Sequence, residues 1–267
     1  MSLSSDNILS IKDLYLSGKT LKQVSDELGI SSSSVFKYIK KMQIPTRIRR
    51  YDINHDYFEK IDSNSKSYLL GYLFADANII FSTINRSYGI KLKLNKKDEH
   101  ILNFLQSEIG SNYPIVDEKG TNCSSVHISS KKMASDLIKL GCVPVKSLIL
   151  EYPNIDKKYW NSFIHGYFDG DGNIYYNDKF GSKQRQFKLL GTFKFLTSIK
   201  EYLNSLWIDS YDVSKYDISN VYQLISSKIE SLKKIYKLFY ENSDYIFLER
   251  KRDIFKRAII DHKKVSK

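Results

Sequence analysis

The sequence predicts an α+β fold in which one structural unit is used twice, preceded by a small all-α domain. Two apolar runs carry the repeat, "YLLGYLFADANI" and "FIHGYFDGDGNI", and each is typical of a helix that ends in an aspartate. A second match, "ISSK" at Ile128 and again at Ile225, has an offset of 97 residues, close to the 95 residues that separate the two aspartates. Self-similarity at a near-fixed spacing indicates one unit repeated along the chain.

The same order of elements is expected after each of these helices. In the first half, the apolar run "NIIFS" and the alternating pattern of "SYGIKLKLN" predict two strands, and "DEHILNFLQSEIG" predicts a helix. Short strands near residues 113–116 and 124–129 and a helix at 131–140 follow. The second half repeats the order through "GNIYYN", "QFKLLGT", "FLTSIKEYLNSLW", "NVYQLISS" and "IESLKKIYKLFY". The predicted order is helix, two strands, helix, two strands, helix, in each half.

Each motif helix carries a stripe of small residues. Gly71 and Ala75 lie four positions apart, as do Gly166 and Gly170, so each pair shares one helix face. Such stripes let two helix backbones approach closely. We therefore expect the two helices to pack against each other and to bring their terminal aspartates together. The alternative is two ordinary buried helices with tolerated glycines, which a matched pair in one chain makes the weaker interpretation.

The terminal aspartates, Asp76 and Asp171, occupy an unfavourable place for a carboxylate. The C-terminal end of a helix dipole is negative, so an aspartate there costs roughly 0.3 to 1 kcal/mol unless something positive faces it. Two aspartates in this position predict a metal site.

The paired segments resemble the LAGLIDADG homing endonucleases, as do "LGCVPVKSLILEYPNI" before the second motif and "YENSDYIFLERKRDIF" near the end. Single-chain members of this family form a pseudo-twofold dimer of two αββαββα halves around a helix-helix seam. The resemblance covers residues 68–258 and implies a first half at residues 61–152 and a second half at residues 153–267. Ala77 departs from the family, where glycine is usual, and we expect the following Asn78 to tolerate the left-handed conformation that ends a helix.

Residues 1–45 predict a separate domain of three short helices. Gly18 closes the first helix, Gly29 marks the turn after the second, and a serine caps a third helix from about Ser32. The pattern resembles a helix-turn-helix of the resolvase or homeodomain-like kind, whose last helix reads DNA, although any small three-helix domain is an alternative. Residues 46–60 are expected to form an extended basic linker that can follow a DNA groove. From these two segments we expect DNA contacts by Ser32, Ser33, Ser34, Lys37, Lys40, Arg47, Arg49 and Arg50.

Composition indicates a polyanion-binding protein of about two domains. The chain has 267 residues, 42% of them hydrophobic, and a net charge of +12. Residues 1–50 hold nine Lys and Arg against four Asp and Glu, and residues 249–267 hold eight against three. Charge alone does not separate DNA from RNA or from an anionic membrane. The start of the chain does not resemble a signal peptide and no apolar run approaches about 18 residues, so a soluble, intracellular protein without a membrane partner is expected. A monomer is also expected, since one chain holds both repeated units.

The resemblance implies a site-specific double-strand DNA endonuclease that hydrolyses phosphodiester bonds with a divalent metal and leaves staggered 3′ overhangs. By resemblance, Asp76 and Asp171 bind the metal with the backbone carbonyls of Ala75 and Gly170, and each half cuts one strand. Oxygen ligands suit Mg²⁺, or another divalent cation such as Mn²⁺, better than zinc. The expected partner is double-stranded DNA with a long, largely asymmetric target site.

Three more residues are expected near the reaction. Lys146 and Lys251 match the basic residue that, in each half of the family's members, faces the reacting phosphate and orders water. Surface lysine is the alternative for both. Asn95 is expected to act in the first half, and Gly191 stands in its place in the second, so the two active sites need not be equivalent.

Strand alternation predicts where the DNA lies. In "IKLKLN", Lys91 and Lys93 share one face while the apolar residues share the other, as a sheet with one side on a core and one on DNA requires. Gln186 and Lys188 are the matching polar residues of "QFKLLGT". An ordinary solvated face is the alternative.

Two other classes of function remain open. An RNA-splicing maturase or a DNA-binding regulator would use the same fold with cleavage lost. The retained aspartates argue against it, while Ala77 and Gly191 favour it. A DNA recombinase would share the helix-turn-helix, but the sequence has no nucleophilic serine or tyrosine in a known context.

Overall fold

Two separate hydrophobic cores divide the chain into the units Met1–Arg50 and Tyr51–Lys267. The computed structural model describes residues 4–46, 51–84, 87–144, 149–177, 184–216, 221–241, 243 and 245–260. Across these residues, none of the helices combines the length and the apolar character that crossing a bilayer requires.

The N-terminal unit contains the three expected helices, α1 (Ser5–Leu16), α2 (Leu21–Leu28) and α3 (Ser32–Lys41). Gly29 ends α2 in the left-handed conformation, with φ 65°, and the Ser31 side chain caps α3 by accepting from the Ser34 backbone nitrogen. The core of this unit is formed by Ile11, Tyr15, Val24, Val35 and Ile39. The three helices are confirmed, and their assignment as a helix-turn-helix stays a prediction.

The second unit contains two halves with the same order of elements. The first half consists of α4 (Asn64–Asp76), β1 (Asn78–Ser82), β2 (Ser87–Asn95), the 3-10 turn η1 (Lys96–Asp98), α5 (Glu99–Glu108), β3 (Ile115–Asp117), β4 (Cys123–Ile128) and α6 (Lys131–Lys139). The second half consists of η3 (Lys157–Tyr159), α7 (Trp160–Asp171), β5 (Asn173–Asn177), β6 (Gln184–Gly191), α8 (Phe193–Ser205), β7 (Ser214–Lys215), β8 (Tyr222–Ser226), α9 (Ile229–Tyr240) and α10 (Glu249–Ile259).

The two antiparallel sheets have the same topology. Their strand orders are β1-β2-β4-β3 and β5-β6-β8-β7. The predicted α+β fold with two pseudo-symmetric halves is therefore confirmed. Helix α10, which packs on β5 and α9, is an addition to the predicted order.

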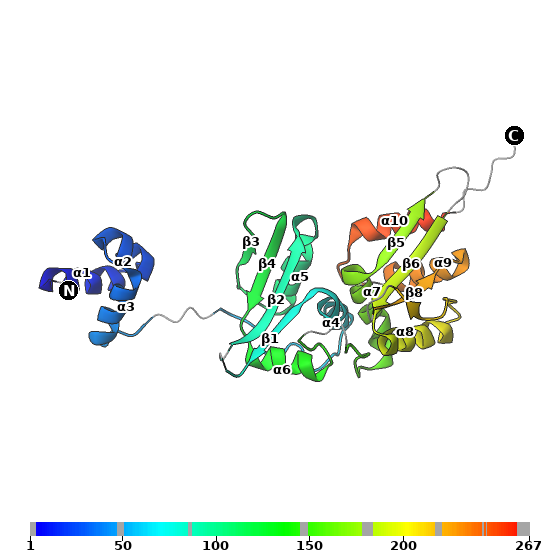
Figure 1. Ribbon diagram of the computed structural model, residues 1–267, viewed down its shortest axis with the longest axis horizontal. Coiled ribbons are helices and arrows are strands. Elements are labelled where there is room, and N and C mark those ends of the chain that lie inside the picture. The colour runs from blue at the N-terminus through cyan, green and yellow to red at the C-terminus, as the bar shows by residue number, and fades with distance from the viewer. Residues whose placement is uncertain are drawn as a thin grey trace. The chain divides into compact units, whose positions relative to one another are not determined.

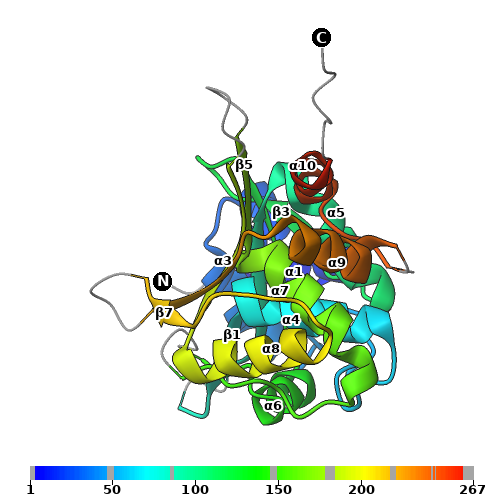
Figure 2. The ribbon, with the colours of Figure 1, turned by 90° about the vertical axis from the view of Figure 1, so that its right-hand side faces the viewer.

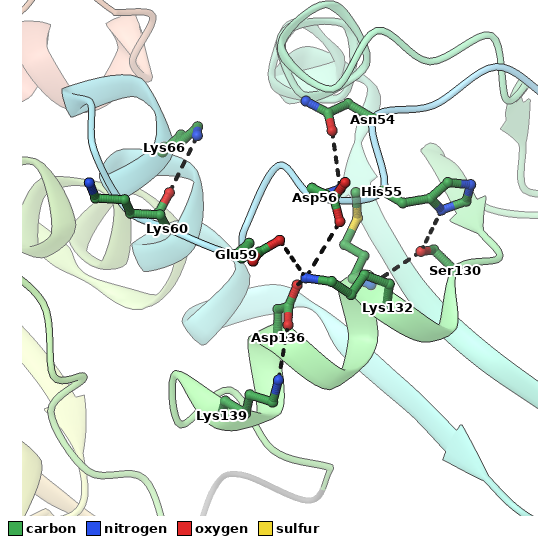
Figure 3. Close-up of polar contacts among 11 residues, drawn as sticks. Asn54, His55, Asp56, Glu59, Lys60, Lys66, Ser130, Lys132, Asp136 and Lys139 are labelled. Carbon is green, nitrogen blue, oxygen red and sulfur yellow. Dashed lines mark hydrogen bonds and ion pairs between the residues drawn. The ribbon is translucent and has the colours of Figure 1, made fainter.

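The expected linker of residues 46–60 is shorter in the structure, because residues 51–60 fold onto the first half. Lys132 of α6 lies 3.5 Å from the Asp56 carboxylate and 2.9 Å from that of Glu59, so two acidic side chains hold this segment to the helix (Figure 3). Two apolar side chains from the same stretch, Tyr57 and Phe58, enter the core, as does the next apolar residue, Ile61.

Helices α4 and α7 cross in backbone contact and lie side by side between the two sheets (Figure 1). A Cβ atom added to Gly71 would lie 2.0 Å from the carbonyl oxygen of Phe163, and one added to Gly166 would lie 1.9 Å from that of Tyr68. No side chain fits at either glycine. The small residues therefore set the distance between the helices, as the sequence predicts.

The first motif helix ends without a left-handed residue. Ala77 has φ −76° and ψ 144°, and its counterpart Gly172 has φ −75° and ψ 158°, so both are extended. Asn78 is the first residue of β1. The tolerance of Asn78 for a left-handed conformation is not used, since Asn78 is extended, and alanine is accommodated at position 77 without backbone strain. Gly172 is needed for space instead, since a Cβ there would lie 2.3 Å from the Phe168 ring.

Gly166→Ala is expected to lower the free energy of unfolding by roughly 3 kcal/mol, because the new methyl group must push apart two backbones rather than a flexible side chain. Denaturant unfolding measures the change, and Asn103→Ala, at an exposed position of α5, serves as the matched control. Equal stability of Gly166→Ala and wild type would contradict the close crossing.

Candidate metal centre

The crossed helices end at Asp76 and Asp171. Small residues hold the helices together here as well. A Cβ atom added to Gly170 would lie 2.2 Å from the Cβ of Ala75 and 3.5 Å from Oδ2 of Asp76. Both aspartates are exposed. The crossing therefore brings one accessible carboxylate from each half to the same end of the helix pair.

The two carboxylates create a region of negative potential. Burial raises the pKa of the Tyr167 hydroxyl, and the charges of Asp171 and Asp76 raise it further. Both motif helices are described in full, and neither has a basic residue in its last turn. The negative ends of the two helix dipoles add to the two carboxylates, and the charge of Lys251 from α10 offsets part of this potential. The exposed carboxylates make this end of the pair a candidate site for a bound cation.

The donor atoms fit a hard divalent cation. Within the described part of the chain, no group of three or more His, Cys, Asp and Glu residues forms a closed metal site. Two carboxylates make an open set of oxygen donors, which suits Mg²⁺ because that ion keeps several water ligands. Ala75 and Gly170 directly precede the aspartates in the last helical turn, where backbone carbonyls have no partner within the helix. Their predicted part in metal binding is compatible with this position.

Lys251 binds the end of α7. Its Nζ donates to the carbonyl oxygens of Phe168 (2.5 Å), Asp169 (2.8 Å) and Gly172 (2.6 Å), and the residue is only 6% exposed. Burial lowers the pKa of Lys251 to about 8, against the opposing attraction of Asp169. Lys251 therefore acts as a cap on the helix that carries Asp171. Its expected place facing a phosphate stays a prediction.

Sequence reasoning missed Asp169, which is 1% exposed within α7. Its Oδ2 accepts hydrogen bonds from the Tyr68 hydroxyl (2.8 Å) and from the Leu248 backbone nitrogen (2.9 Å). Burial raises the pKa of Asp169 to about 6. These contacts fix α7 both to α4 and to the start of α10. The sequence did contain a signal for Asp169, because it is an acidic residue inside an apolar run, at the position where the first motif has Phe74.

A second contact that the sequence did not reveal joins the two halves. Arg250 of α10 donates from Nε and Nη2 to the two carboxylate oxygens of Asp98, at 2.9 and 2.8 Å. Asp98 is buried, and a two-pronged pair of this kind is among the stronger charged hydrogen bonds. Because Lys251 is the next residue, this pair also holds the lysine in place.

Strand register shows which residues of the two halves correspond. Lys91 pairs with Asn78 and Lys188 pairs with Asn173, and each asparagine lies two residues beyond the last residue of its motif helix. Corresponding positions on β2 and β6 are therefore 97 residues apart (188 minus 91).

Asn95 consequently corresponds to Thr192, and the expectation that Gly191 stands in its place is wrong. Both residues cap the element that follows. The Asn95 side chain accepts from the Lys97 backbone nitrogen (3.2 Å), and that of Thr192 accepts from the Phe195 nitrogen (3.2 Å). The catalytic role expected for Asn95 stays a prediction.

The residues expected to contact DNA are placed as follows. On β2, Lys91 is half-buried and pairs with Glu118 at 3.0 Å, while Lys93 is exposed. Gln186 and Lys188 are half-buried on β6. Helix α3 carries Ser32, Ser33, Ser34, Lys37 and Lys40, all at least partly exposed. Arg47, Arg49, Arg50 and Lys146 lie outside the described residues.

No protein-family model matches the chain, and no curated protein sequence matches it. Solved structures do share its fold. The I-LtrWI LAGLIDADG homing endonuclease bound to target DNA has a TM-score of 0.53 at 14% identity, over 77% of this chain and 90% of that one. The I-SmaMI LAGLIDADG homing endonuclease bound to cleaved DNA has a TM-score of 0.52 at 12% identity, over 75% of this chain and 90% of the other.

The I-GzeII complex with a DNA target gives the same result, with a TM-score of 0.51 at 11% identity over 72% of this chain and 87% of that one. Each of these proteins is named a LAGLIDADG homing endonuclease, and the likeness extends over most of each one's length. The chain therefore has the fold of the single-chain LAGLIDADG homing endonucleases.

Proposed function

We propose that the chain is a site-specific DNA endonuclease of the homing type, which cuts both strands of a duplex with Mg²⁺ or Mn²⁺ held by Asp76 and Asp171. The observation that carries the proposal is the meeting of two exposed carboxylates at the ends of helices in backbone contact. A carboxylate at this end of a helix is unfavourable unless a positive charge faces it, and the chain uses this position in both halves. Support also comes from I-LtrWI, solved with target DNA, and I-SmaMI, solved with cleaved DNA.

A divalent ion bound by this pair would supply an activated water and would neutralise charge on the phosphate and on the leaving oxygen. The part played by the chain itself is positioning. Asp76 and Asp171 come from different halves, so each half presents one carboxylate to one strand. Lys251 binds the carbonyls of Asp169 and Gly172, which lie on either side of Gly170 and Asp171, and so orients that end of α7. One cut by each half accounts for a break in both strands, and the 3′ overhangs are proposed from the family resemblance.

Two features of the sequence, Ala77 and Gly191, favoured an RNA-splicing maturase or a DNA-binding regulator that has this fold and has lost cleavage. In the structure, neither feature supports that function. Ala77 is extended and unstrained, so the first motif helix ends as the second does. Gly191 is not the counterpart of Asn95. The maturase or regulator is therefore left without an observation in its favour, while both carboxylates remain exposed.

Incubating the full-length protein with a randomised duplex library in Mg²⁺ should release 3′-overhang ends from one family of sequences. EDTA is expected to stop cleavage and to leave affinity for the selected duplex within a few-fold, because the ion takes part in the reaction and not in reading bases. Sequencing of the cut ends and gel-shift titration measure the two effects. Undiminished cutting in EDTA would contradict the metal site, and tight binding without cutting in Mg²⁺ or Mn²⁺ would favour a regulator.

We also propose that residues 1–45 bind DNA through α3, followed by arginine contacts from the linker. The helix begins with three consecutive serines, Ser32, Ser33 and Ser34, and Lys37 and Lys40 follow on it. Short polar side chains and lysines on one short helix suit contact with phosphates and base edges. The unit has its own core, so it can be removed without exposing the core of the second unit.

Deleting residues 1–50 is expected to flatten the salt dependence of DNA binding by roughly two to three units of log-log slope. Each phosphate neutralised contributes about 0.9, and about a third of the nine Lys and Arg residues in this segment can reach DNA at once. Footprinting should show protection lost at one end of the site only, and the remaining unit should still cut at higher protein concentration. A folded truncation with an unchanged slope and footprint would show that the N-terminal unit does not bind the target.

A further inference from the structure

The second sheet has one face covered by helices, and on its other face, called the open face below, none of the described helices packs. Ile174, Phe187 and Leu189 are buried on the face against which α8 and α10 pack. Figure 2 shows this sheet nearly edge-on, with α9 and α10 on one side of it. Alternate residues of a strand point to the opposite side. On β5 and β6 these are Asn173, Tyr175, Asn177, Gln184, Gln186, Lys188 and Leu190. None of the seven is acidic, and four are carboxamides.

Gln184 and Gln186 line one hollow on this open face. The hollow has a volume of about 470 Å³, and its other walls are Tyr175, Arg185 and Ser227. The Arg185 guanidinium donates to the Ala258 carbonyl oxygen of α10 at 3.1 Å. Tyr175 is 44% exposed, and its hydroxyl accepts a hydrogen bond from the Asn177 amide at 3.0 Å. The Asn177 amide is thereby held by Tyr175. The two glutamines are the carboxamides that line the recess itself.

A carboxamide in this position suits one base in particular. In the major groove, Gln or Asn bonds adenine at N6 and N7 together, whereas Lys and Arg suit guanine. Two residues along a strand span about 6.8 Å, which equals two base-pair steps of about 3.4 Å. We propose that Gln184 and Gln186 read two adenines, two base-pair steps apart, in the half of the DNA target that the second sheet binds. The inference rests on the proposed DNA-binding function and adds the sequence preference.

Strand register gives the direction of this preference along the DNA. Lys188 pairs with Asn173, which follows Asp171 closely, so that end of the open face lies next to the proposed metal site. Along β6, Gln186 lies two residues farther from the proposed metal site than Lys188, and Gln184 lies four residues farther than Lys188. The adenine read by Gln184 is therefore expected to lie farther from the cut than the adenine read by Gln186.

The first sheet lacks this pair of amides. Its positions corresponding to Gln186 and Gln184 are Gly89 and Ser87, 97 residues earlier in each case. A Cβ atom at Gly89 would lie 2.1 Å from the Ile128 carbonyl oxygen, so no longer side chain can take its place. Adenines with this spacing are therefore expected in one half of the target and not in the other.

Selection of bound sequences from a randomised duplex library, with EDTA present to prevent cutting, tests the proposal on the full-length protein. Wild type should select adenine at two positions two steps apart. Gln186→Ala should reduce adenine preference roughly tenfold at the inner position only, and Gln184→Ala at the outer position only. Gln186→Lys should change the inner preference from adenine to guanine. Asn204→Ala, an exposed amide on α8, is the matched control and should select the wild-type sequence.

The outcomes separate this inference from the proposed function. If the protein binds a specific sequence and both glutamine variants keep the wild-type preferences, the adenine assignment is overturned. The endonuclease proposal is unaffected by that result. Adenine preferences lost together, or at positions with another spacing, also overturn it, because the strand geometry requires two independent readers two steps apart. Wild type that selects no sequence at all overturns both. Matched thermal unfolding of each variant with wild type shows that the changes are local.

Discussion

Asp76→Asn and Asp171→Asn are each expected to abolish double-strand cleavage while DNA affinity stays within a few-fold of wild type. Asparagine keeps the size of aspartate but replaces an anionic ligand with a neutral amide, so the proposed metal ion loses a charged donor. Neither aspartate is expected to contact a base, and binding should therefore persist. Single-turnover cleavage and gel-shift titration of the selected target measure the two effects separately.

Stability gives an independent check on these two variants. Each aspartate lies at the negative end of its own helix dipole, and its neutralisation relieves roughly 0.3 to 1 kcal/mol of that repulsion. The charge of Lys251 attracts both carboxylates and opposes this gain, so the free energy of unfolding in the absence of metal should stay within about 1 kcal/mol of wild type. Loss of activity at nearly unchanged stability identifies a residue kept for function, whereas loss of activity caused by misfolding would come with a clear loss of stability.

Asp253→Asn, at an exposed position of α10, is the matched control and should cut at the wild-type rate. Full double-strand cutting by either Asp76→Asn or Asp171→Asn would contradict the assignment of the metal site. A variant that still nicks one strand would show instead that the two halves act without coupling, with the strand that is cut identifying the intact half.

The parts of the fold that were predicted from sequence are those set by local patterns. Strand β2 alternates apolar and polar residues along its length, and Gly71 and Gly166 recur at the same place in two apolar helices. Both signals reflect geometry within one element, a period of two for a strand and a spacing of four for a helix face. The contact between α4 and α7 was predictable because the two stripes are complementary.

Contacts between distant segments were not predictable in this way. The pairing of Arg250 with Asp98 spans 152 positions, and nothing in either local pattern identifies the partner. The same holds for Lys251, whose partners are three backbone carbonyls that carry no signal in the sequence. Residues 51–60 follow a basic stretch, yet Asp56 and Glu59 bind Lys132 and make the segment part of the fold.

The misplacement of Gly191 has a specific physical cause. Side chains of a strand alternate between faces, so a shift of one residue in an alignment moves a position from the open face to the core. Gly191 lies on the core side, where a Cβ would meet the Phe195 ring at 3.0 Å, and it corresponds to the buried Leu94. The sequence alone did not show how β2 and β6 align with each other, because these two strands have few identical residues.

Lys251→Met is expected to destabilise the protein by roughly 2 to 4 kcal/mol. Methionine fills similar space but leaves the buried carbonyls of Phe168, Asp169 and Gly172 without their shared donor. Relief from burying a charge offsets part of this loss, so the net effect is smaller than that of three separate hydrogen bonds. Denaturant unfolding at pH 7 measures the change.

The pH dependence of this difference has a defined sign. The pKa of Lys251 in the folded protein is about 8, below its ordinary value of 10.5. Between these two values the unfolded chain binds more protons at this site than the folded chain, so the contribution of Lys251 to stability increases as pH rises. The deficit of Lys251→Met relative to wild type should therefore grow from pH 8 to pH 10.5.

Cleavage by Lys251→Met should fall roughly 10²-fold, more than binding, because the lysine holds the end of α7 where Asp171 is placed. Lys256→Met, exposed on the same helix, should change neither stability nor rate. Lys146→Ala, the matching residue of the first half, should slow cleavage to a similar degree. If Lys251→Met slows cleavage with no loss of stability, the lysine acts on the phosphate as the family resemblance implies. If stability falls while cleavage by the folded protein is unchanged, Lys251 is a helix cap with no part in the reaction.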